Sequence, residues 1–143
     1  MKSYTDIEQS KKLAEILPLE SADMVLLQEE PYETSDSKFD GLHQALCVPF
    51  NKYDKPWRQK YANISYFPCW SLAALLSVLP NSENISTDLS RGGYEISTLE
   101  YTNSWFVEYE DETDSLNNCV TSADNPIDAC VAMIERLHEL KML

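Results

Sequence analysis

Residues 94–110 read YEISTLEYTNSWFVEYE, and this stretch decides the fold class. Its two halves, Tyr94–Tyr101 and Trp105–Glu110, are rich in β-branched and aromatic residues, and a short polar segment separates them. Two such runs joined by a few turn-forming residues predict an antiparallel hairpin. In the second half, Trp105, Val107 and Tyr109 alternate with Phe106, Glu108 and Glu110. We therefore expect one face of this strand to be buried and the other to be partly exposed to water.

Helices are predicted on both sides of this hairpin, at about 6–17, 68–79 and 126–141. The first begins with the capping-box pattern Thr5-Asp6-Ile7-Glu8, in which Thr5 is the expected cap. The second starts at Pro68 and is apolar around nearly its whole circumference, which favours a buried central position that includes Leu76. The third has a cap at Asn125 and proline at its first position.

The chain between the first two helices is harder to interpret. Met24–Gln28 and Ala45–Phe50 are candidate short strands, with a polar, acidic loop between them, and Asn51–Asn63 is expected to be irregular. With the hairpin and the helices, these segments predict an α+β fold: a small antiparallel sheet packed by about three helices. The 143 residues have the length of one domain, so we expect a single domain covering 1–143.

The charge balance restricts the expected partners. The chain has 24 acidic residues against 11 basic ones, a formal charge of −13. Such a protein is repelled by nucleic-acid phosphates and by anionic membrane surfaces, so we expect it to bind neither. An unknown protein partner of basic character is the expected kind, and the sequence leaves the oligomeric state open.

The four cysteines, Cys47, Cys69, Cys119 and Cys130, form no CxxC pair, and the first residues lack the unbroken apolar core of a signal peptide. We therefore expect free thiols in a reducing, cytoplasmic setting. The longest apolar stretch, Cys69–Leu79, is about half the length that spans a bilayer.

No motif for catalysis or for a cofactor is present. Three glycines are too few for GxGxxG or for a P-loop, so no cofactor is expected. The histidines and cysteines make no zinc pattern, and His138 is interpreted as a packing residue on the apolar side of the last helix. The acidic cluster lacks the order of an EF-hand loop and is expected to be a solvated hairpin end; its members are Glu108, Glu110, Asp111, Glu112 and Asp114.

One basic cluster interleaved with aromatic residues is a candidate interaction patch. Such a pattern can bind single-stranded nucleic acid by charge and stacking, but on this acidic background a local counter-charge is the favoured interpretation. The patch consists of Lys52, Tyr53, Lys55, Trp57, Arg58, Lys60 and Tyr61.

Three stretches carry a family resemblance: SKKLAEILPLESADM at 10–24, FPCWSLAALLSVLP at 67–80 and DNPIDACVAMIERLHELKML at 124–143. Together they resemble a family of small uncharacterised proteins from gut Bacteroidetes genomes, often found near prophage or other mobile elements. The resemblance covers about a third of the chain and rests on texture, so no functional residue is carried over. It implies a bacterial intracellular setting and a mobile-element role.

Three functions follow as hypotheses. The first is a non-enzymatic interaction protein of bacterial or mobile-element origin, which leads because every chemical motif fails. The second is an acidic decoy that presents carboxylates where a DNA-binding protein expects phosphates. The third is a small enzyme with an unrecognised site. A long stripe of carboxylates would favour the decoy, and a deep pocket holding a histidine or Cys47 would favour the enzyme.

Overall fold

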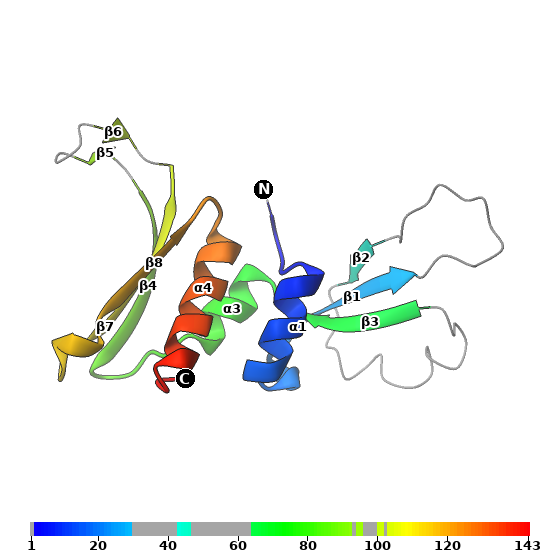
Figure 1. Ribbon diagram of the computed structural model, residues 1–143, viewed down its shortest axis with the longest axis horizontal. Helices are drawn as coiled ribbons and strands as arrows, with labels where there is room; N and C mark the ends of the chain where they lie inside the picture. Colours follow the sequence, from blue (N-terminus) through cyan, green and yellow to red (C-terminus); the bar gives the residue numbers. More distant parts are fainter. Residues whose placement is uncertain (1, 30–42, 47–63, 93, 96–99, 102) are drawn as a thin grey trace. The chain divides into compact units, whose positions relative to one another are not determined.

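The computed structural model describes residues 2–29, 43–46, 64–92, 94–95, 100–101 and 103–143 (Figure 1). This part of the chain has an α+β fold with three α-helices, two three-stranded antiparallel sheets and one two-stranded pair, which confirms the predicted fold class. The chain divides into two compact units, Tyr4–Ala74 and Met1–Ser3 with Leu75–Leu143. That both units form a single domain of residues 1–143 stays a prediction.

The unit Tyr4–Ala74 contains a sheet in the order β2-β1-β3, whose strands are β2 (His43–Leu46), β1 (Met24–Glu29) and β3 (Ile64–Cys69). Helix α1 (Ile7–Ile16) packs against β3, and the short 3-10 helix η1 (Leu19–Ser21) leads into β1. The strand predicted at Met24–Gln28 is confirmed as β1, whereas the one predicted at Ala45–Phe50 overlaps β2 only at 45–46 and otherwise lies outside the described residues. The core cluster consists of Met24, Leu26 and Cys69, with Tyr4, Ile7 and Phe67 packed against it.

The N-cap of helix α1 lies one residue later than predicted. Asp6 is the cap: its side chain accepts from the backbone N–H of Gln9, and the Gln9 side chain accepts from the N–H of Asp6. The sequence fits a capping box at either position, so the local pattern could not decide between them. Thr5 is fully buried instead, and its hydroxyl accepts a hydrogen bond from the backbone N–H of Trp70.

The helix expected at 68–79 is shorter. Helix α3 spans Leu72–Val78, and Pro68 lies in β3 opposite Val25. Proline fits there because β3 lies at the edge of its sheet among the described strands, where a missing N–H can face away from the ladder. Within α3 the expected apolar stripe is also displaced: Leu75 is fully buried, while Leu76 is only half-buried.

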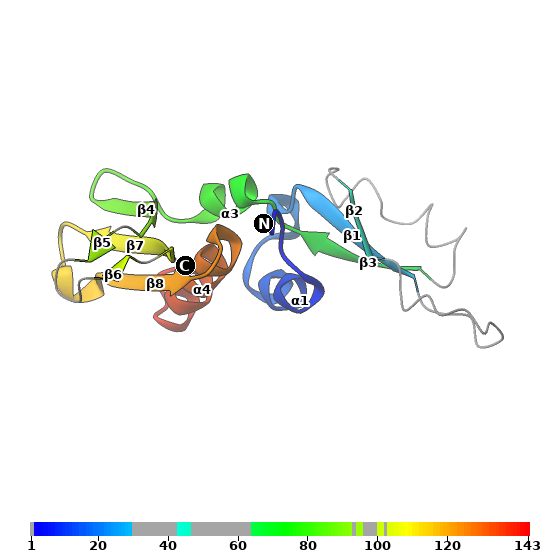
Figure 2. The same cartoon turned by 90° about the horizontal axis from the view of Figure 1, so that it is seen from above.

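The unit containing Leu75–Leu143 is built on a sheet in the order β4-β7-β8, with β4 (Ile85–Arg91), β7 (Trp105–Asp111) and β8 (Cys119–Ala123). Helix α4 (Pro126–Glu139) lies along one face, beside β7 and β8 (Figures 1 and 2). A separate pair, β5 (Tyr94–Glu95) with β6 (Glu100–Tyr101), and the 3-10 helix η3 (Ser115–Asn117) complete this unit.

The predicted hairpin is present as antiparallel structure, but its pairing differs. Residues Trp105–Asp111 pair with β4 and β8, whereas β5 pairs with β6. The reason is the alternation in 85–91, ISTDLSR, where Ile85, Thr87 and Leu89 supply the inward side of a strand. That pattern makes β4 a better partner for β7 than the segment nearer in sequence.

Helix α4 follows its sequence signals. The Asn125 side chain accepts from the backbone N–H of Asp128, and Pro126 occupies the first turn. Lys2 forms an ion pair with Asp128 at 2.8 Å. The buried side of the helix contains Ile127, Ala129, Cys130, Val131, Met133, Ile134 and Leu137. In the described residues, no helix is both long enough and apolar enough to cross a bilayer.

Candidate functional site

The sheet β4-β7-β8 has two unlike faces. Its inner face packs toward α4, where Val107 and Tyr109 are buried. Its outer face carries the alternate residues, most of them exposed, and we define the outer face by Ser86, Asp88, Ser90, Phe106, Glu108, Glu110, Val120 and Ser122. Because side chains alternate along each strand, the register alone places these eight on one side.

Two carboxylates of the outer face stand directly opposite each other. Asp88 on β4 pairs with Glu108 on β7, and both are exposed. Like charges in this cross-strand position destabilise a sheet. Glu110, two residues along β7, faces the uncharged Ser86 instead. The outer face therefore concentrates negative charge at a small cost in stability.

An apolar side chain is exposed next to these carboxylates, and another is exposed in the turn before β8. Val120 completes the row of Asp88 and Glu108, and 59% of its surface is exposed. Leu116, in the 3-10 helix just before β8, is 92% exposed. A single exposed apolar residue is ordinary, but Val120 in one row with two carboxylates makes a mixed surface suited to a partner with a basic and an apolar side.

The acidic residues at the end of β7 accept hydrogen bonds within a turn. Oδ1 of Asp111 accepts from the backbone N–H of Thr113, from the Thr113 hydroxyl and from the N–H of Asp114, and Oδ2 accepts from the Asn117 side chain. These hydrogen bonds, first those of Thr113 and Asn117, lower the pKa of Asp111 to about 2. Asp114 caps η3 by accepting from Leu116. These two carboxylates hold the turn together, in keeping with the expected solvated hairpin end.

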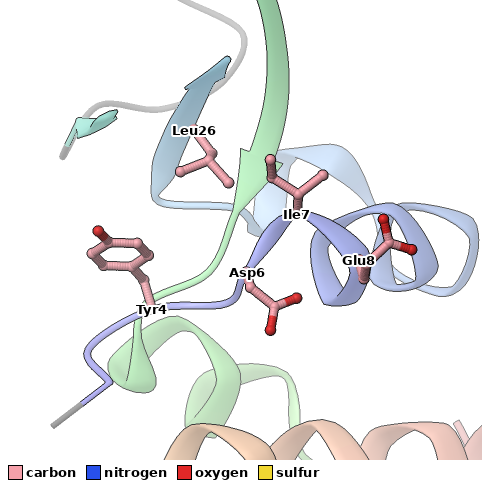
Figure 3. Close-up of a pocket in the computed structure, with 5 residues that line it drawn as sticks. All are labelled: Tyr4, Asp6, Ile7, Glu8 and Leu26. Atoms are coloured by element: carbon pink, nitrogen blue, oxygen red, sulfur yellow. The ribbon is translucent and has the colours of Figure 1, made fainter. Parts of the chain in front are cut away.

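A mostly apolar pocket of about 360 Å³ lies in the other unit, at the start of α1. Figure 3 shows Tyr4, Ile7 and Leu26 around it, with Asp6 and Glu8 on the adjoining first turn of α1. Leu26 belongs to the core cluster, so the pocket reaches the core of this unit. Its described lining contains no histidine or cysteine, and its polar groups are the phenol of Tyr4 and the carboxylates of Asp6 and Glu8.

The described cysteines are not activated. Cys69 and Cys130 are fully buried and Cys119 is half-buried; burial raises the pKa of each thiol, that of Cys130 to about 11. A reactive cysteine needs a lowered pKa, because the thiolate is the nucleophile. Cys69 instead donates to the backbone oxygen of Thr5 over 3.4 Å, in a buried network that joins α1 to β3. These thiols act as small core residues.

The interpretation of His138 as a packing residue is wrong, because its side chain is exposed. It follows the buried Leu137 by about 100° of helical rotation, in the last turn of α4, where the apolar side has ended. His43 lies in β2, and no group of three or more His, Cys, Asp or Glu able to hold a metal occurs in the described part of the chain. The predicted patch and Cys47 lie outside the described residues; the patch is Lys52, Tyr53, Lys55, Trp57, Arg58, Lys60 and Tyr61.

Only some residues of the outer face could be predicted from the sequence. Glu108 and Glu110 could be assigned to one side of a strand from their spacing. Asp88 and Val120 were missed, although Ile85, Thr87 and Leu89, each followed by a small polar or acidic residue, were a usable signal for the strand that carries Asp88. For Val120, the signal is weaker, because β8 is only CVTSA.

Comparison of the chain with protein-family models, with curated proteins and with solved structures finds no match. The site must therefore be interpreted from its own geometry.

Proposed function

We propose that this protein is a non-enzymatic interaction protein that binds a basic protein partner through the outer face of the sheet β4-β7-β8. The observation that carries the proposal is the exposed row of Asp88, Glu108 and Val120, with Glu110 beside it. A basic partner would relieve the repulsion between Asp88 and Glu108 and cover Val120. The formal charge of −13 adds long-range attraction for such a partner.

The described chemistry supports binding over catalysis. The described thiols are buried or have a raised pKa, and the described lining of the pocket beside α1 offers Asp6, Glu8 and the phenol of Tyr4 as ionisable side chains. Asp6 is already engaged as the cap of α1. A small enzyme with an unrecognised site is for these reasons the third hypothesis.

The setting belongs to the same proposal. The resemblance to small Bacteroidetes proteins points to a bacterial, cytoplasmic protein with a mobile-element role. In such a setting a basic protein of the host or of the element is a reasonable partner.

The acidic decoy is the second candidate. The carboxylates of Glu108 and Glu110, on one face of one strand, are spaced roughly 7 Å apart, so they present two negative charges in line, as a decoy would. The described outer face carries only three carboxylates, whereas a DNA-binding protein commonly contacts about 6–10 phosphates. A decoy would compete with DNA for a host nuclease or repressor, and an ordinary interaction protein would not.

The direct test removes the three charges of the outer face. We expect Asp88→Asn, Glu108→Gln and Glu110→Gln together to weaken binding of a fluorescent oligolysine, measured by anisotropy, about threefold to 150-fold. This range follows from roughly 0.2–1 kcal/mol for each exposed charge pair.

The control variant removes three exposed carboxylates elsewhere, by Glu8→Gln, Glu15→Gln and Glu20→Gln on α1 and η1. Both variants lose the same net charge. Equal weakening by the two variants would show that the oligolysine senses net charge alone, and the proposal would be abandoned.

A further inference from the structure

The partner's binding mode can be inferred from the backbone of the same sheet. Gly92 donates its N–H to the carbonyl oxygen of Ser104 over 2.6 Å. At the other end of the ladder, Glu112 donates to the carbonyl oxygen of Asn84 over 2.9 Å. Hydrogen-bonded and non-bonded pairs alternate in an antiparallel ladder, so the even-numbered residues of β7 direct their backbone groups toward β4.

The odd-numbered residues of β7 must then direct their backbone groups toward β8. Their partners on β8 are Cys119, Thr121 and Ala123. The two remaining strand residues, Val120 and Ser122, consequently point their N–H and C=O groups away from β7, along the outer edge of the sheet. No other strand in the described residues pairs with this edge.

The two edges of the sheet differ. On β4 the backbone N–H of Thr87, which points outward, donates to the Asn81 side chain over 3.0 Å, and the Thr87 hydroxyl donates to the carbonyl oxygen of Pro80. The chain just before β4 thus covers that edge. Strand β8, with the sequence CVTSA, contains no lysine, proline or other residue of the kind that protects an edge strand.

We propose that β8 accepts an extended segment of the basic partner as a fourth strand of this sheet. A lysine or arginine of the segment lies with its aliphatic stem over Val120 and with its charged head at Glu108. This inference rests on the proposed function and specifies how the partner binds.

The spacing of a sheet supports this arrangement. An added strand lies about 5 Å beyond β8, so its outward side chains start roughly 10 Å from β7. Long basic side chains cover that distance while their stems bury apolar surface. Val120, 59% exposed and in register with Glu108, occupies the position that such a stem would cover. Backbone hydrogen bonds to Val120 and Ser122 would supply the affinity that is independent of charge.

A partner of basic character fits this edge better than a second copy of the chain. Two copies would each bring a formal charge of −13 to the contact, and both edge strands would carry the same neighbouring carboxylates. Like-charge contacts of this kind oppose association.

The test compares Ser122→Pro with Ser122→Ala. Proline removes the outward N–H but leaves the ladder to β7 intact, since Ser122 does not donate to it. Alanine keeps the N–H and serves as the matched control. With a blocked peptide of alternating lysine and valine, we expect Ser122→Pro to weaken binding about twofold to tenfold, the effect of one backbone hydrogen bond, and Ser122→Ala to leave it unchanged. Circular dichroism checks that both variants are folded.

A second variant keeps the proposal testable if Ser122→Pro does not fold. Val120→Ala shortens the apolar side chain without touching the backbone. We expect it to weaken peptide binding about twofold to threefold, because the lysine stem then removes less apolar surface from water.

The outcomes separate this inference from the proposed function. If the triple outer-face variant loses affinity and neither Ser122→Pro nor Val120→Ala does, the acidic surface binds the partner without strand addition, and the inference is overturned. If none of these variants loses affinity, both the proposed function and the strand-addition inference are overturned. Dimerisation of the wild-type protein in sedimentation, abolished by Ser122→Pro, would assign the edge to a second copy and overturn the inference as well.

Discussion

Reversing the charge of Glu108 should make the protein more stable. Glu108 lies directly opposite Asp88, so Glu108→Lys replaces a like-charge pair by an opposite-charge pair. The matched control is Glu110→Lys: it lies on the same strand and the same face, is also exposed and gives the same net charge, but is directly opposite Ser86.

The magnitude follows from Coulomb's law. Two unit charges about 5 Å apart repel by about 0.8 kcal/mol in water, and screening with a Debye length of about 8 Å halves this. Reversing one sign removes about 0.4 kcal/mol of repulsion and adds a similar attraction, so the pairing with Asp88 should contribute about 0.8 kcal/mol of stabilisation in Glu108→Lys. The diagonal neighbours Glu110 and Asp88 are about 7–8 Å apart, so the control should gain about half as much from Asp88. The interaction between positions 108 and 110 changes sign in both variants and therefore cancels in their difference.

The assay is urea denaturation followed by tryptophan fluorescence, with both variants also made in an Asp88→Asn background. The difference between the two lysine variants should disappear in that background and also at about 1 M salt, where the Debye length falls to about 3 Å. Equal stabilities of the two lysine variants, or a difference that persists without Asp88, would refute the reasoning. So would a loss of stability in Glu108→Lys with none in the control.

The other predictions concern the core and the turn. Leu75→Ala should cost about 2–5 kcal/mol of unfolding free energy because Leu75 is fully buried, whereas the half-buried Leu76 should cost clearly less on truncation; equal costs in denaturation would contradict the assignment. Thr5→Val should cost about 1–3 kcal/mol because it leaves the buried N–H of Trp70 without its acceptor, and Thr5→Ser should cost less; a neutral Thr5→Val would contradict this. The pKa of Asp111 is about 2 in the folded protein, below its ordinary value near 4. Its contribution to the free energy of unfolding is therefore present above about pH 4 and is lost as the pH falls toward about 2. The free energy of unfolding of Asp111→Ala should fall less than that of the wild type between these pH values, and an equal fall would count against this prediction.

Local signals in the sequence were enough for the elements with strong caps or strong periodicity. Helix α4 was predicted almost to its ends because Asn125 and Pro126 mark its start and its buried residues recur at helical spacing. Helix α1 was predicted with its cap displaced by one residue, since Thr5 and Asp6 are equivalent in the local pattern. Only the pairing of Thr5 with Trp70, far away in the sequence, decides between them.

The pairing of strands that are distant in the sequence could not be predicted from the sequence. The segment ISYFPC at 64–69 was assigned partly to a helix because Pro68 suits a helix start; its place in an edge strand depends on β1 as a partner. In the same way, Asp88 can be assigned to the acidic row only when β4 is known to pair with β7, because the register then puts it opposite Glu108. The acidic composition was evident from the start, but its concentration beside Val120 depends on the order of the strands.

The central claim is that β8 is an open edge that a basic segment can extend. Amide hydrogen exchange of the isotope-labelled protein, followed by NMR with and without the lysine–valine peptide, tests it most directly. In the free protein the N–H groups of Val120 and Ser122 should exchange rapidly, while those of Cys119, Thr121 and Ala123, which face β7, are protected. On addition of the peptide, the exchange of Val120 and Ser122 should slow markedly. Protection of these two amides before the peptide is added, or unchanged rapid exchange when the peptide is bound, would contradict the account.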